Sequence, residues 1–167
     1  MLTSLVVKYR HKGVLIDTNL LIGFLIGGWN PRHLIHCRAT KSFNEQDFAL
    51  LDRFLGNFQT LVTTPQILTE VSNLAGKLPK QLHTEFRARF GGLIDGLLEK
   101  YEPSKAIASH KDFISFGLAD TAISMISPGN HLVLTDEVAL FNLLQKRGVD
   151  AVNFNHLRGE ALLLRAK

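Results

Sequence analysis

Residues 14–25 read VLIDTNLLIGFL, and this stretch decides the fold. The apolar run Val14 to Ile16 predicts a short buried strand. The apolar residues from Thr18 to Ile26 predict a helix, which the pair Gly27-Gly28 ends. Asp17 stands at the junction of strand and helix, where a charge is costly unless a ligand or a backbone donor compensates it. The junction is therefore the first candidate site.

The alternation of strand and helix continues towards the C-terminus. Further strands are predicted at 61–63, 131–135 and 149–154, and helices at 45–58, 64–76, 79–100, 115–127, 137–147 and 156–166. Such alternation indicates βαβ units and a parallel sheet covered on both faces. We expect one α/β domain spanning residues 1–167, a three-layer α/β/α sandwich with a central, mostly parallel sheet of four to five short strands. Residues 29–44 lack a clear period and are predicted to form a basic insertion.

Composition restricts the class of protein. With 46% hydrophobic and 20% charged residues, the 167-residue chain is typical of one globular domain. Its formal charge of +4 favours a polyanionic partner. Cys37 is the only cysteine, so no internal disulfide is available and a reducing compartment is expected. The apolar stretch Leu20 to Ile26 is too short to span a bilayer, and residues 1–13 do not form a signal peptide. We expect a cytoplasmic protein with no membrane partner.

Four acidic residues lie at predicted junctions or in apolar helices: Asp17, Glu70, Asp120 and Asp136. Each has a structural alternative. Asp17 and Asp136 precede helices and suit an N-cap worth roughly 1 kcal/mol. Asp120 suits the positive end of its helix. Glu70 borders an apolar stripe in mid-helix, where capping gives no benefit and only contact with solvent explains it otherwise.

Taken together, the four acids predict a metal site. The carboxyl ends of parallel strands are where ligand sites form, and clustered carboxylates repel one another unless they are protonated or bound to a cation. Ligation by oxygen alone suits Mg²⁺ or Mn²⁺. Asp136 is preferred over its neighbour Glu137 because it directly follows the strand, although which of the two faces the metal stays open.

Four segments in this order resemble the PIN domain (PilT N-terminus) family of metal-dependent nucleases: VLIDTNLLIGFL, PQILTEVSNL, FGLADTAISMI, and LVLTDEVALF followed by GVDAVNF. The resemblance extends from Val14 to Phe154. It implies that all four acids are catalytic and hold the metal, and that Asn19 and Thr135 orient ligands or substrate. It further implies hydrolysis of RNA to 5′-phosphate and 3′-hydroxyl ends.

The resemblance implies a Mg²⁺- or Mn²⁺-dependent endoribonuclease. The single-domain size of the chain is similar to that of toxins of the VapC type, so the resemblance implies RNA and an antitoxin protein as partners. A second copy of the chain is a further candidate partner, on the basis of apolar helix faces. Phe48, Phe54 and Phe58 would suit either a dimer interface or the core. An RNA-processing nuclease outside a toxin–antitoxin pair and a non-catalytic RNA-binding or scaffold domain are the alternatives. An aspartyl phosphatase is disfavoured because Asp17-Thr18-Asn19 lacks a second acid two residues after the first.

Basic and aromatic residues supply candidates for RNA contacts. The candidate phosphate contacts are Arg32, His33, Arg38, Lys41, Lys105, His110 and Lys111. Packing in the core or in a hairpin is the preferred interpretation of Trp29 and Tyr101, with stacking on a base as the alternative. The pattern His33-x-x-His36-Cys37 lacks a fourth ligand at the spacing of a zinc finger, which argues against zinc.

Overall fold

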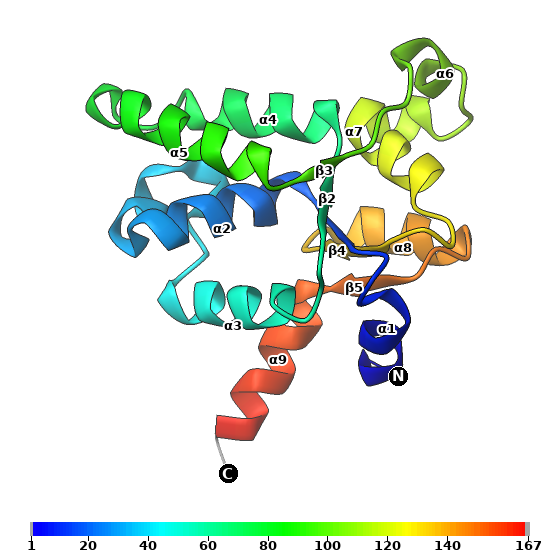
Figure 1. Cartoon of the computed structure of the whole chain (residues 1–167), viewed down its shortest axis with the longest axis horizontal. Coiled ribbons are helices and arrows are strands. Elements are labelled where there is room, and N and C mark those ends of the chain that lie inside the picture. The colour runs from blue at the N-terminus through cyan, green and yellow to red at the C-terminus, as the bar shows by residue number, and fades with distance from the viewer. Residues whose placement is uncertain (1, 166–167) are drawn as a thin grey trace.

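The computed structural model describes residues 2–165 and confirms the α/β sandwich. Its sheet contains five parallel strands in the order β3-β2-β1-β4-β5 (Figure 1). Their bounds are β1 Val14–Ile16, β2 Leu61–Thr63, β3 Leu98–Glu99, β4 Leu132–Thr135 and β5 Ala151–Asn153.

Helices cover both faces of this sheet (Figure 1). They are α1 Leu2–Tyr9, α2 Thr18–Trp29, α3 Glu45–Leu55, α4 Pro65–Ala75, α5 His83–Asp95, α6 Ser104–Ala108, α7 Phe113–Ile126, α8 Val138–Lys146 and α9 Phe154–Arg165. Right-handed crossovers place α2 to α5 on one face, since β1, β2 and β3 succeed one another in one direction. They place α6 to α8 on the other face, since β4 and β5 succeed in the opposite direction. No helix in the described range is long and apolar enough to cross a bilayer.

The two central strands of the sheet are buried, and the order of the strands around them sets the position of the candidate site. Every residue of β1 and of β4 is fully buried. β1 pairs with β2 on one side and with β4 on the other, so the direction of strand succession reverses between β1 and β4. In open parallel sheets a ligand crevice forms beyond the carboxyl ends of the strands at such a reversal. Asp17 follows β1 at this point, and Asp136 follows β4.

The segment predicted as one helix over 79–100 is instead three elements. A 3₁₀ turn, η3 (Lys80–Leu82), precedes α5, and β3 follows it. Gly96 ends α5, its N–H bonding to Leu93 O, and the next residues turn towards the sheet. The Lys100 N–H donates to Thr63 O at 2.9 Å, which fixes β3 as an edge strand beside β2. The end of this segment forms a strand because it pairs with β2, which is remote in sequence.

Two glycines lie where the observed helices differ from the predicted ones. α2 does not end at Gly27-Gly28 but continues to Trp29. A Cβ added at Gly27 would lie 2.7 Å from Phe48 Cδ2, so the missing side chain lets α3 pack closely on α2. Gly117 lies inside α7 at φ +72°, a left-handed conformation that favours glycine, and it breaks the helix.

The insertion at 29–44 folds as two 3₁₀ turns, η1 (Pro31–His36) and η2 (Arg38–Thr40), packed against α2. Leu34 and Cys37 are buried, and the Thr40 hydroxyl donates to Leu34 O at 2.6 Å. The insertion is therefore ordered structure rather than a free loop. Phe54 and Phe58 are also buried, so they belong to the core rather than to an exposed dimer face.

Candidate active site

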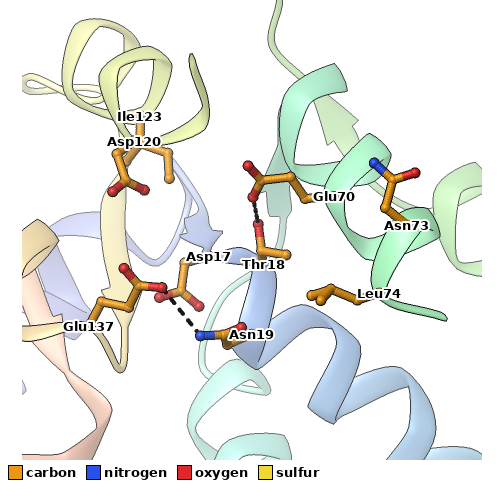
Figure 2. Close-up of a pocket in the computed structure, with 9 residues that line it drawn as sticks. All are labelled: Asp17, Thr18, Asn19, Glu70, Asn73, Leu74, Asp120, Ile123 and Glu137. Atoms are coloured by element: carbon orange, nitrogen blue, oxygen red, sulfur yellow. Dashed lines mark hydrogen bonds between the residues drawn. The ribbon is translucent and has the colours of Figure 1, made fainter. Parts of the chain in front are cut away.

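A cavity of about 210 Å³ lies where β1 and β4 end, between α4 and α7 (Figure 2). Its lining residues are Asp17, Thr18, Asn19, Glu70, Asn73, Leu74, Asp120, Ile123 and Glu137. Three of the four acids predicted from the sequence therefore border one cavity, although they come from segments far apart in the chain. The fourth position is taken by Glu137.

Asp17 is the most buried of these acids, at 5% exposure. One carboxylate oxygen caps α2 by accepting the Leu20 N–H at 3.1 Å, and the other accepts the Asp136 N–H at 3.1 Å. Burial and the neighbouring Asp136 charge raise the pKa of Asp17 to about 8, although hydrogen bonding from Thr135 opposes the shift. Asp17 is thus the predicted N-cap of α2. It also lines the cavity with a carboxylate that two backbone N–H groups hold in place and whose charged form is disfavoured by burial.

Asp120 and Glu70 project from facing helices, α7 and α4, towards Asp17 (Figure 2). Asp120 forms no hydrogen bond or ion pair within the described part of the chain. Burial, together with the neighbouring charges of Glu137 and Glu70, raises the pKa of Asp120 to about 7. Glu70 is exposed, and its carboxylate accepts the Thr18 hydroxyl at 2.7 Å. Both side chains border the cavity as the sequence predicts.

Glu137, rather than Asp136, lines the cavity. The Asp136 N–H is bound to Asp17, and its carboxylate has only a long contact of 3.5 Å from the Asn19 amide. The Glu137 N–H donates to the Thr135 hydroxyl at 3.0 Å, and its carboxylate accepts from Asn19 at 3.3 Å. Burial, Asp136 and Glu70 all raise the pKa of Glu137. The tight turn after β4 thus presents the second acid of the pair to the cavity.

The four acids have the chemistry to bind a divalent cation, but their carboxylates lie too far apart to coordinate one together as they stand. Among residues 2–165, no three acidic, histidine or cysteine side chains are grouped closely enough to hold a metal ion as they stand. Figure 2 nevertheless shows the carboxylates of Asp17, Glu70, Asp120 and Glu137 directed into one space. Hard oxygen donors of this kind suit Mg²⁺ or Mn²⁺. Glu70 and Glu137 have long side chains, so rotation about their bonds is the change that would close the set.

Sequence reasoning missed Asn73. It lies one turn after Glu70 on α4, lines the cavity, and makes no hydrogen bond in the described structure. The spacing of three residues, which places two side chains on one helix face, was the available signal. Leu74, four residues after Glu70, lines the cavity from the same face of α4, and Thr18 lines it because it directly follows Asp17.

The predicted phosphate contacts lie away from the cavity. None of Arg32, His33, Arg38, Lys41, Lys105, His110 and Lys111 borders it. Trp29 packs against His33, with ring centroids 4.5 Å apart, and under the Arg89 guanidinium at 5.5 Å. It is therefore a packing residue. Tyr101, in contrast, is 70% exposed.

No protein-family model matches the chain, and no curated protein or solved structure is similar enough to count as a match. The resemblance to the PIN domain family therefore stays a prediction from sequence segments.

Proposed function

We propose that this protein is a metal-dependent endoribonuclease of the PIN type, with Asp17, Glu70, Asp120 and Glu137 as the acids of its active site. The observation that carries the proposal is the convergence of these four side chains, from four separate elements, on one cavity. Carboxylates grouped around one cavity repel one another unless a proton or a bound cation compensates their charge. Asp136 then acts on the site through Asp17 and Asn19 rather than by facing the cavity.

The side chains divide into fixed and adjustable groups. Asp17 is held by two backbone N–H groups and sets the floor of the site. Asn19 holds Glu137, and Thr18 holds Glu70, each through one hydrogen bond to the carboxylate of a long side chain. Asp120 is free to accept a ligand. A divalent cation held by these acids would activate water and neutralise charge on a phosphodiester undergoing in-line displacement.

RNA is the proposed substrate, and the cytoplasm is the proposed compartment. The net charge of +4 includes the site's acids, so the remainder of the molecule is more basic than this value suggests. Neutralisation by an antitoxin is proposed from the resemblance alone. The RNA-processing enzyme remains the second candidate, since it would use the same site.

The proposal is tested by incubating the protein with single-stranded RNA and Mg²⁺ or Mn²⁺. We expect internal cleavage that a chelator stops. Asp120→Asn should lower the cleavage rate by roughly 100-fold or more, because even the partners of metal ligands cost up to that factor when removed. Asp120 has no hydrogen bond to lose, so the circular dichroism and the melting temperature should show an intact fold.

Asp52→Asn is the matched control, since Asp52 is exposed on α3 and does not line the cavity. It should leave cleavage unchanged. Cleavage by Asp120→Asn at the wild-type rate would contradict the site assignment. A protein that retards RNA in a gel without shortening it is a binding domain, and release of phosphate only from monoesters would indicate a phosphatase.

A further inference from the structure

A second hollow, of about 510 Å³, lies beside β3 and the C-terminal end of α7. Its lining residues are Lys12, Lys100, Tyr101, Glu102, Met125, Ile126, Asn130 and His131. Asp120 and Ile123 border the acidic cavity, whereas Met125 and Ile126 border this hollow from the following turn of the same helix. β3 is the edge strand of the sheet, next to β2. We call this hollow the basic groove.

The charge of the basic groove comes from two lysines that no acid pairs with. Within residues 2–165, neither Lys12 nor Lys100 forms a salt bridge. The Lys12 ammonium donates to Gly129 O at 2.8 Å, which holds it at the rim. His131 is 6% exposed, with its Nδ1 bonded to Lys12 O at 3.0 Å. Glu102 is the one acid in the lining, so the lining carries a net positive charge.

Tyr101 supplies an aromatic surface at the rim of this groove. Its side chain is 70% exposed, and no aromatic ring packs on it in the described residues. The backbone beside it is fixed, because the Lys100 N–H donates to Thr63 O in the sheet. An exposed ring on a fixed backbone loses little conformational freedom on binding. Aromatic rings next to basic side chains are how many proteins hold single-stranded nucleic acid, by stacking bases and neutralising phosphates.

We infer that the basic groove binds a segment of single-stranded RNA next to the bond that the acidic cavity cleaves, with Tyr101 stacking on a base and Lys12 and Lys100 contacting phosphates. The identity of the polyanion as RNA rests on the proposed function. Six residues separate Asp120 from Ile126, which is about 9 Å along the axis of α7. Lys12 and His131 precede β1 and β4, so their end of the groove lies at the edge of the sheet opposite Asp17, and an RNA strand that occupies both sites must run along α7. The acidic cavity repels phosphates when no cation is present, so the groove supplies the attraction that it lacks.

The test measures RNA binding without cleavage. A fluorescein-labelled single-stranded RNA of about 12 nucleotides is titrated with the full chain in chelator, and anisotropy is recorded over a range of salt concentrations. Tyr101→Ala should weaken binding roughly fivefold or more. Lys100→Ala and Lys12→Gln should each lower the slope of log affinity against log salt by about 0.7, the value for one phosphate on a single strand. Lys12→Gln keeps a donor for Gly129 O.

Lys77→Ala and Lys146→Ala are the matched controls, since both lysines are exposed and neither lines the groove. They should change affinity less than twofold. Melting temperatures within a few degrees of wild type would show that each variant is folded. Equal affinities for the groove variants and the controls would overturn this inference, as would a wild-type chain that binds no RNA at low salt. Because divalent ions are absent, loss of cleavage alone leaves the binding result intact, and the two proposals fail separately.

Discussion

Two adjacent acids that follow β4, Asp136 and Glu137, have different positions and roles. The Asp136 N–H is bound to Asp17, and the Glu137 N–H is bound to the Thr135 hydroxyl, so both backbone positions in this turn are fixed by side chains. The turn directs Glu137 into the cavity, while Asp136 stays beside Asn19 and Asp17.

We predict that Glu137→Gln lowers the rate of RNA cleavage by roughly 100-fold or more, whereas Asp136→Asn lowers it by about tenfold, the smaller cost typical of a group that acts through a ligand. Steady-state rates at saturating Mn²⁺ measure both. The two variants lose the same charge from neighbouring positions, so each is the control for the other. A larger loss in Asp136→Asn would restore Asp136 as the acid that faces the metal.

Asp17, Glu70 and Asp120 could be placed in one site from the sequence, but the choice between Asp136 and Glu137 could not. The alternation of side chains along a strand ends with β4 at Thr135. Beyond it, the path of the chain depends on the hydrogen bonds to Asp17 and Thr135, one of which crosses between strands remote in sequence. Periodicity carries no information about such contacts. Asn73 differs, because its spacing of three residues from Glu70 was a signal that the sequence did contain.

Close packing between α2 and α3 depends on Gly27. Phe48 of α3 lies over it, stacked on Phe24 with ring centroids 6.0 Å apart. The neighbouring Gly28 has more room, because an added Cβ would meet the same ring at an ordinary 3.5 Å. The two glycines look equivalent in sequence and differ only in what α3 places above them.

We predict that Gly27→Ala lowers the free energy of unfolding by about 1–3 kcal/mol, because the ring of Phe48 must shift. Gly28→Ala should instead raise it by about 0.5–1 kcal/mol through the better helix propensity of alanine. Urea unfolding followed by circular dichroism measures both. Equal effects of the same sign would show that the α2–α3 contact is looser than the structure indicates.

The edge strand β3 could not be predicted from the local sequence. Residues 79–100 are consistent with helix, and β1, β2, β4 and β5 could all be predicted because each is a short apolar run bounded by turn residues. β3 has only two residues, both exposed, and its strand conformation comes from pairing with β2. An element defined by a distant partner rather than by its own pattern cannot be found from local periodicity.

The whole molecule is destabilised by the site that would give it activity. Asp17 and Asp120 hold protons more tightly in the folded chain, with pKa values of about 8 and about 7, than an ordinary aspartate at 3.8 does. The folded state therefore binds more protons than the unfolded state between about pH 4 and about pH 8. Stability from these two groups is greatest at low pH and falls as pH rises through their folded pKa values. The shift in the pKa of His131 is downward, so its contribution has the opposite trend.

We predict that, in chelator, the melting temperature of Asp17→Asn/Asp120→Asn minus that of the wild type increases as pH rises from 5 to 8, because only the wild type loses stability through these two carboxyls. Taking the difference removes the contribution of His131, which both proteins share.

Mg²⁺ or Mn²⁺ at about 100 times its Kd should stabilise the wild type by about 2.7 kcal/mol, a rise of roughly 5–10 °C for a chain of this length. The rise should be larger at pH 8 than at pH 5, since cations compete with protons for the carboxylates, and it should be absent in the double variant. Differential scanning fluorimetry measures all of these values. A melting temperature that divalent ions leave unchanged at pH 8 would show that the four acids hold no metal, and would remove the basis for the nuclease.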